Sequence, residues 1–291
     1  MERFSISELQ QFSGVKAHTI RIWEQRYHAL KPDRSEGNTR YYDGRQLRRL
    51  LNIVSLSKED YKISELCAMT DKDLFKLLDQ QTFHAEPRYE YFVTQIIASA
   101  LEYDEVQFDK IFSTAILRFG VYTTYNSVLY PVLVRLGLMW SKDALRPSHE
   151  HFVTSLFRQK LFTVIDSIAL PLSTKETWML FLPANELHET GLLFANYLVR
   201  QSRRKVIYLG PDVPFESLKA AALEMKPGCL LTFLVRKNNK EDDEQFLSLL
   251  STEFRDKNIY VACEPSRLQG IKKRKNIVAL HSAEELKSII E

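Results

Sequence analysis

The sequence LPANELHETGLLFANYLVRQ, residues 182–201, connects an apolar run to an amphipathic segment through a short polar loop. The run WMLFLP ends at Pro183, and after Gly191 apolar residues recur at three- and four-residue spacings, which predicts a helix. His188 lies in the loop, three residues before Gly191. If the run is a strand of a parallel α/β sheet, this loop lies at the sheet edge where ligands bind.

The rest of residues 175–291 repeats this alternation. Strand-like runs TWMLFLP, KVIYLG, CLLTFLV, NIYVAC and NIVAL alternate with helical segments at 189–203, 214–225, 241–256 and 282–290. The pattern predicts a doubly wound, flavodoxin-like parallel α/β domain. Before it, residues 88–171 contain four segments with helical apolar spacing, which predict a four-helix bundle.

Residues 1–80 predict a winged helix-turn-helix, with a glycine turn between two helices and KPDRSEGNTRYYD as the wing. Ser7 is expected to cap the first helix and Asp43 the helix after the wing, while Val15, Ile20 and Trp23 face inward. Residues 1–50 contain ten Lys and Arg against six Asp and Glu, whereas the other 241 residues contain 30 and 31. Positive charge concentrated in one domain is typical of a module that binds phosphates.

The composition is that of a globular protein, with 45% hydrophobic and 26% charged residues. No apolar run approaches the roughly 18 residues of a membrane span, and no secretory signal is visible. We therefore expect a cytoplasmic protein with no membrane partner. The three cysteines are too far apart in sequence to predict disulfides or a zinc site. Phosphate-binding glycine motifs, a complete zinc-protease helix and a nucleophile elbow are also missing, so an enzyme is not expected.

The loop histidine has a chemistry of its own. A neutral imidazole at His188 can bind a metal through one nitrogen, while the Glu186 carboxylate accepts a hydrogen bond from the other and fixes the tautomer. One histidine holds a free metal ion poorly, but it can bind a metal already chelated in a large ring. A loop histidine is more often a solvated side chain, and the residues alone leave this alternative open.

This part of the sequence resembles cobalamin-binding domains, whose signature is Asp-x-His-x-x-Gly, then Ser-x-Leu, then Gly-Gly. The matching residues are Glu186, His188, Gly191, Thr232 and Leu234, with Glu in place of Asp and Thr in place of Ser. The resemblance implies that His188 is the lower axial ligand of the cobalt in adenosylcobalamin. It also implies that the other four contact the cofactor.

The third part of the signature is altered. Ala262 and Cys263 stand where the resemblance places the glycine pair that lets the cobalamin tail lie against the backbone. Cys263 is still predicted to contact the cofactor. The replacement motivates an alternative in which the cofactor site has degenerated.

The helical segment before this domain supports the same resemblance. Trp140, followed ten residues later by Glu150 and His151, is similar to the bundle signature of light-sensing, cobalamin-dependent repressors of the MerR family. The resemblance implies that Trp140 covers the adenosyl face of the cofactor, with Glu150 and His151 nearby. In the photoreceptors a histidine follows the tryptophan directly and binds cobalt after illumination, whereas Ser141 follows here.

The N-terminal sequence HTIRIWEQRY…RSEGNTRYYD is similar to MerR-type regulators. The resemblance, together with the expected position of the recognition helix, predicts base or phosphate contacts by the helix and phosphate contacts by the wing. The predicted DNA-contacting residues are Lys16, His18, Thr19, Arg21, Arg26, Arg40 and Tyr41.

Three functions remain to be weighed. The first is a transcription regulator that binds a double-stranded DNA operator as a homodimer or homotetramer under the control of adenosylcobalamin, with light as a candidate signal. The second has the same architecture but a degenerate cofactor site, and is regulated by a protein partner or by expression level. The third is a corrinoid-carrying methyl-transfer module, which the basic helix-turn-helix disfavours.

Overall fold

The computed structural model describes residues 3–35, 37–57, 61–80, 89–140, 146–169, 176–236, 240–268 and 272–291. The chain forms two compact units, Met1–Leu156 and Phe157–Glu291. The boundary between them falls within the long helix α9 (Pro147–Asp166). No helix in the described part of the chain is both long and apolar enough to cross a membrane.

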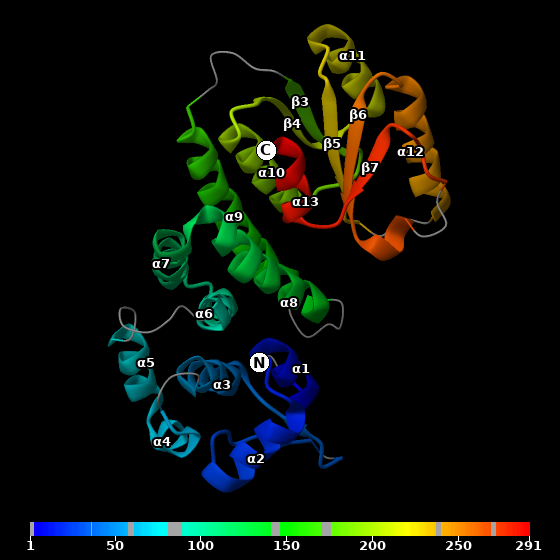
Figure 1. Ribbon diagram of the computed structural model, residues 1–291. Helices are drawn as coiled ribbons and strands as arrows, with labels where there is room; N and C mark the ends of the chain where they lie inside the picture. The colour runs from blue at the N-terminus through cyan, green and yellow to red at the C-terminus, as the bar shows by residue number, and fades with distance from the viewer. Residues whose placement is uncertain are drawn as a thin grey trace. The chain divides into compact units, whose positions relative to one another are not determined.

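The described residues of the first unit form helices and one small hairpin (Figure 1). Its elements before α9 are α1 (Ile6–Ser13), α2 (Ala17–Tyr27), β1 (Asp33–Arg34), β2 (Arg40–Tyr41), α3 (Gly44–Ser57), α4 (Ile63–Ala68), α5 (Asp71–Gln80), α6 (Tyr89–Glu102), α7 (Glu105–Thr124), η2 (Tyr125–Leu129) and α8 (Tyr130–Trp140). Strands β1 and β2 pair antiparallel, and Phe4 forms a bridge with Tyr42 beside them. This hairpin is the predicted wing.

The start of α1 differs from the expectation. Ser5, not Ser7, is the N-cap, and it forms a capping box with Glu8 in which each side chain accepts a hydrogen bond from the other residue's backbone N–H. The capping box gives hydrogen-bond acceptors to two backbone N–H groups, those of Ser5 and Glu8, so Ser5 is the better cap. Gly14, with φ of 70°, ends the helix in the left-handed conformation that favours glycine.

The core of the helix-turn-helix consists partly of other residues than the sequence predicted. Ile20 is fully buried, whereas Val15 and Trp23 are only partly buried. Phe4 and Phe12 are fully buried in this core, and their ring centres are 5.6 Å apart in an edge-to-face contact. Helix α3 then begins after Asp43, whose side chain accepts a hydrogen bond from the N–H of Gln46, as predicted.

Helices α6, α7, α8 and α9 are the four segments predicted between residues 88 and 171. Gly120 has φ of 74° and interrupts α7, so two of these segments meet inside one element. Farther on, Pro131 lacks the N–H that a regular helix would donate to the preceding turn. The hydrogen-bond ladder widens to the π-helix η2 just before this proline.

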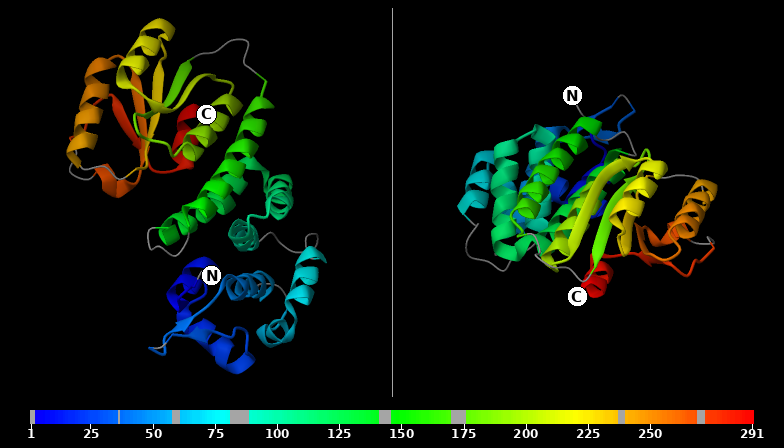
Figure 2. Two further views of the ribbon diagram at one scale, coloured as in Figure 1. Left: turned by 180° about the vertical axis from the view of Figure 1, so that it is seen from behind. Right: turned by 90° about the horizontal axis from the view of Figure 1, so that it is seen from above.

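The second unit is a five-stranded parallel sheet covered by helices on both faces (Figures 1 and 2). Its elements are β3 (Thr177–Pro183), α10 (Thr190–Gln201), β4 (Lys205–Val213), α11 (Phe215–Met225), β5 (Cys229–Leu234), α12 (Lys240–Glu253), β6 (Asn258–Cys263), η3 (Pro265–Leu268), β7 (Ile277–Leu280) and α13 (Ala283–Ile290). The strand order is β4-β3-β5-β6-β7 with every pair parallel. The predicted doubly wound α/β fold is confirmed.

Alternation along the strands divides the second unit's core between the two faces. Met179 and Phe181 of β3 pack with Leu218 of α11 and Leu250 of α12 in one apolar cluster. Helices α10 and α13 cover the opposite face (Figure 1). The strand order reverses between β3 and β5, so the loops after these two strands form the switch point where such folds bind ligands.

Candidate DNA-binding face and cofactor site

Five of the predicted DNA-contacting residues lie at or on α2. The side chains of Lys16, His18, Arg21 and Arg26 are exposed, and that of Thr19 is partly exposed. Ile20 of the same helix is fully buried. Helix α2 is therefore fixed by its apolar side and presents a basic side to solvent, which is the arrangement that a recognition helix requires.

The wing is attached to α2 by the carboxylate of Glu24, which is not one of the predicted DNA-contacting residues. Glu24 Oε1 accepts a hydrogen bond from Arg40 Nε at 2.9 Å, and Glu24 Oε2 accepts one from the Tyr42 hydroxyl at 2.8 Å. Burial and the Glu24 carboxylate raise the pKa of Tyr42 above its usual range. The guanidinium of Arg3 lies 4.5 Å from the ring centre of Tyr41. Glu24 is the one acid of α2, which also contains Arg21 and Arg26, and an acid in this helix was the signal for the contact.

His188 lies on the loop after β3, and its side chain is 52% exposed. Its Nδ1 is 2.5 Å from Glu186 Oε1, and the backbone N–H of His188 donates to the same oxygen at 3.2 Å. When the ring is neutral and its Nδ1–H donates to the carboxylate, the lone pair that can bind a metal is on Nε2. The predicted pairing of these two residues is therefore present in the structure.

Glu186 also joins the two loops at the switch point. Its other oxygen, Oε2, accepts hydrogen bonds from the backbone N–H groups of Val235 at 2.9 Å and Arg236 at 2.6 Å, directly after β5. Burial alone would raise the pKa of Glu186, but the hydrogen bonds from His188, Arg236 and Val235 together lower it to about 2. The carboxylate is thus ionised and holds the His188 ring in one orientation.

A second buried carboxylate fixes the start of α10. Glu189 Oε1 accepts a hydrogen bond from the Tyr208 hydroxyl at 2.9 Å, and its Oε2 lies 2.7 Å from Arg158 of α9. Burial, followed by the Glu189 charge, raises the pKa of Tyr208 above its usual range. This triad was not predicted, because Arg158 and Tyr208 are remote from the loop in sequence. The triad holds Glu189, the residue next to His188, through contacts from β4 and α9.

The second signature segment lies on the sheet face away from α10. Thr232 is in register with Phe181 and Val261, which both belong to the apolar cluster under α11 and α12. The Thr232 hydroxyl is fully buried, and none of the described residues forms a hydrogen bond with it. Leu234 belongs to the same cluster.

Cys263, at the end of β6, packs against that cluster too. Burial raises the pKa of its thiol to about 11, so the group is a neutral, partly buried thiol at physiological pH. The structure therefore brings Leu234 and Cys263 together as register partners, but on the opposite face of the sheet from Gly191.

Gly191 is covered by a side chain of this protein. A Cβ at residue 191 would lie 2.8 Å from Cε1 and 3.0 Å from Cδ1 of the Phe233 ring. Glycine is thus required here, but the group that approaches it is Phe233. The residues present fit a chelated metal at His188, because the imidazole is exposed and oriented. They do not leave space at the start of α10 for a large group attached to the chelating ring, because the Phe233 ring covers Gly191.

The remaining predicted cofactor contacts belong to the first unit. The Trp140 side chain and Ser141 lie outside the described residues. His151 is exposed, with its Nδ1 3.6 Å from Glu150 Oε2. His149 is the buried histidine of this helix, and its ring is stacked on Tyr103 at 4.6 Å.

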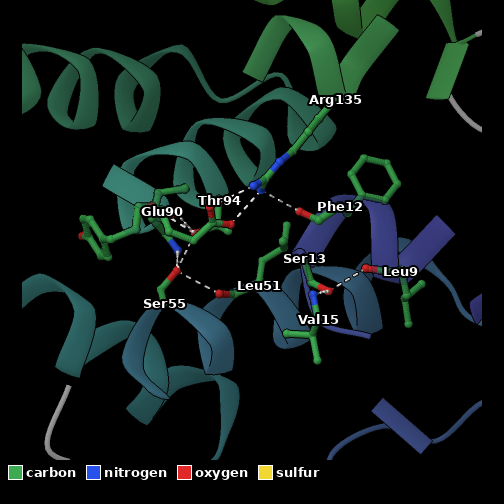
Figure 3. A network of polar contacts seen from close by, with 11 residues as sticks. Leu9, Phe12, Ser13, Val15, Leu51, Ser55, Glu90, Thr94 and Arg135 are labelled. Atoms are coloured by element: carbon green, nitrogen blue, oxygen red, sulfur yellow. Dashed lines mark hydrogen bonds and ion pairs between the residues drawn. The ribbon is translucent and has the colours of Figure 1, made fainter. Parts of the chain in front are cut away.

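A polar network connects the helix-turn-helix with the helices that follow it (Figure 3). Arg135 of α8 donates to both carboxylate oxygens of Glu90 on α6, at 2.7 and 2.8 Å, and to the backbone carbonyl of Phe12 on α1 at 3.3 Å. Nearby, the hydroxyls of Ser55 on α3 and Thr94 on α6 are 2.7 Å apart. Helices α1 and α3 are therefore hydrogen-bonded to the bundle through buried or half-buried groups.

Two family models match the chain. The model "MerR HTH family regulatory protein" matches residues 4–72, and the model "B12 binding domain" matches residues 92–164. The first covers the winged helix-turn-helix, and the second covers most of the described helices α6 to α9.

Two relatives from Myxococcus xanthus align with most of the chain. The HTH-type transcriptional repressor CarH is 27% identical over 253 residues, which are 85% of this chain and 84% of CarH. The HTH-type transcriptional repressor CarA is 27% identical over 281 residues, which are 95% of this chain and 90% of CarA.

The chain is also similar in fold to a solved structure. The monomethylamine corrinoid protein of Methanosarcina barkeri is similar with a TM-score of 0.55 over 69% of this chain and 98% of that protein. At 12% sequence identity the likeness concerns the fold alone.

Proposed function

Because this chain combines a MerR-type helix-turn-helix with a B12-binding domain and is homologous to the CarH and CarA repressors, we propose that it is a DNA-binding transcriptional regulator controlled by a corrinoid. The exposed basic side of α2, braced by the wing, is the observation that carries the DNA-binding part. The chain acts by binding and not by catalysis. It works in the cytoplasm, on an operator of double-stranded DNA.

The α2 side chains enter the major groove, while the wing residues contact phosphates. Arg21, on the exposed side of α2, is the best probe of this contact. Arg40 and Tyr41 are placed by Glu24 and Arg3, so their role depends on the wing staying closed on α2. As dimeric helix-turn-helix proteins do, a homodimer or homotetramer of this chain binds paired half-sites of the operator.

The test uses the purified chain and DNA from the region upstream of its own gene. Arg21→Ala should weaken binding and lower the slope of log affinity against log salt by about 0.9 if one phosphate contact is lost. Arg118→Ala, which removes an exposed arginine from α7, is the matched control and should change neither. Equal binding by all three proteins would refute the assignment of α2.

The proposed cofactor is adenosylcobalamin, with His188 as the lower axial ligand of its cobalt. Glu186 orients the imidazole, and the triad of Glu189, Tyr208 and Arg158 holds the adjoining helix start. When bound, the cofactor supplies a cobalt–carbon bond that light can break. Trp140, Glu150 and His151 stay predicted contacts to its adenosyl side, and Thr232, Leu234 and Cys263 stay predicted contacts from the α/β domain.

Control of DNA binding requires that the cofactor favour one state of the chain over another. The network of Arg135, Glu90 and Phe12 couples the bundle to α1, so a change in the bundle reaches the helix-turn-helix through it. DNA binding then responds to light if loss of the adenosyl group makes the chain favour the other state. Operator binding before and after green light, in the presence of adenosylcobalamin, tests this part.

The second candidate is a regulator with the same DNA-binding face and no working cofactor site. The Phe233 ring against Gly191 and the Ala262 and Cys263 pair favour it. Under this alternative, a protein partner or the expression level sets the occupancy of the operator. It predicts that adenosylcobalamin leaves both the absorption spectrum and DNA affinity unchanged.

A further inference from the structure

The α10 face of the sheet is closed at the point where His188 would present a bound corrinoid. Gly191 is three residues after His188, in the first turn of α10, and it is the only residue there without a side chain. The Phe233 ring occupies the space that this glycine opens, so close that a Cβ would be 2.8 Å from it. A group attached to the lower side of a corrinoid at His188 would therefore contact an aromatic ring and not the exposed backbone of Gly191.

Strand alternation explains why the ring points this way. Thr232 and Leu234 lie on the face covered by α11 and α12, so Phe233 between them projects to the face covered by α10. Ala262 is the register partner of Phe233 on β6 and therefore projects to the same face. A ring and a methyl group thus occupy neighbouring positions at the carboxyl ends of two adjacent strands.

Building on the proposed function, we infer that Phe233 sets the corrinoid specificity of this chain. The site recognises the macrocycle and its metal through His188, and it does not insert the nucleotide tail beside α10. Inserting the tail would require the ring to leave its packed position against Gly191. Corrinoids with and without a nucleotide tail are therefore bound equally well.

The test compares adenosylcobalamin with adenosylcobinamide, which has the same macrocycle and upper ligand but no nucleotide. Each is titrated into the full-length chain in the dark, and binding is followed by absorption and calorimetry. For the native chain, the two Kd values should agree within about threefold, a difference below 1 kcal/mol. Phe233→Ala should bind adenosylcobalamin about tenfold more tightly, because tail contacts then become available, and leave adenosylcobinamide unchanged.

Phe233→Leu is the matched control, because it keeps an apolar side chain that still covers Gly191. It should behave as the native chain does, and it keeps the test valid if the alanine variant fails to fold. Binding of adenosylcobalamin more than tenfold tighter than adenosylcobinamide by the native chain would overturn the inference and leave the proposed cofactor in place. Binding of neither compound by any of the three proteins would overturn both.

Discussion

Phe233 lies against Gly191 so closely that no side chain at residue 191 fits beneath its ring. Gly191→Ala therefore displaces the ring, and we expect it to lower the free energy of unfolding by about 1–3 kcal/mol. Urea unfolding followed by circular dichroism measures the loss. In a Phe233→Ala background the same glycine substitution should cost less than half as much, since the clash is absent. Equal costs in the two backgrounds would show that the ring is not what requires the glycine.

Glu24 holds the wing, so its removal should weaken DNA binding despite the loss of a negative charge. Glu24→Ala leaves Arg40 and Tyr42 without their shared acceptor and should cost about 1–3 kcal/mol of stability. Simple electrostatics would predict tighter DNA binding from the same change. Glu105→Ala, an equal change of charge at an exposed site on α7, is the control. If both variants bind DNA more tightly, the wing does not depend on Glu24.

Arg135 couples α8 to α6 and α1, and its fork geometry is needed for all three contacts. Arg135→Met should lower the free energy of unfolding by about 1–3 kcal/mol and speed amide exchange at the end of α1. Arg135→Lys keeps the charge without the bidentate fork and should lose part of the same stability. Arg118→Met serves as the control on α7. Unchanged exchange in α1 with Arg135→Met would contradict the coupling.

The buried hydroxyl of Thr232 predicts a substitution that raises the free energy of unfolding, whereas the substitutions above lower it. No described residue hydrogen-bonds with this group, so Thr232→Val removes a desolvated polar atom and retains the shape of the side chain. The free energy of unfolding of the cofactor-free chain should rise by about 1 kcal/mol. Thr252→Val, at an exposed position on α12, should have little effect. A loss of stability in Thr232→Val would indicate that the hydroxyl contributes to the fold.

Much of the fold was predictable because its signals are local. Apolar runs and helical spacing located the five strands and the helices of the α/β domain, and turn residues located the wing. The Glu186 and His188 pair was predictable because both residues lie in one loop. The Ser5 cap was missed because two serines, Ser5 and Ser7, lie at the start of the same helix, and the choice depends on the reciprocal bond with Glu8.

What the sequence did not reveal depends on contacts between distant segments. Glu24 reaches the wing, and Arg135 reaches Phe12 across 123 residues. The most consequential case is Phe233, which reads as an ordinary strand residue between Thr232 and Leu234. Only the register of β5 shows that its ring projects to the α10 face and fills the space beside Gly191.

We propose above all that a corrinoid bound at His188 controls operator binding. The most direct measurement is the affinity of the full-length chain for its operator in the dark, with and without adenosylcobalamin, for the native protein and His188→Ala. The cofactor should change the DNA affinity of the native protein by at least about fivefold, the lower end of typical coupling, and leave that of His188→Ala unchanged. An identical response of the two proteins, or no response in either, would contradict it.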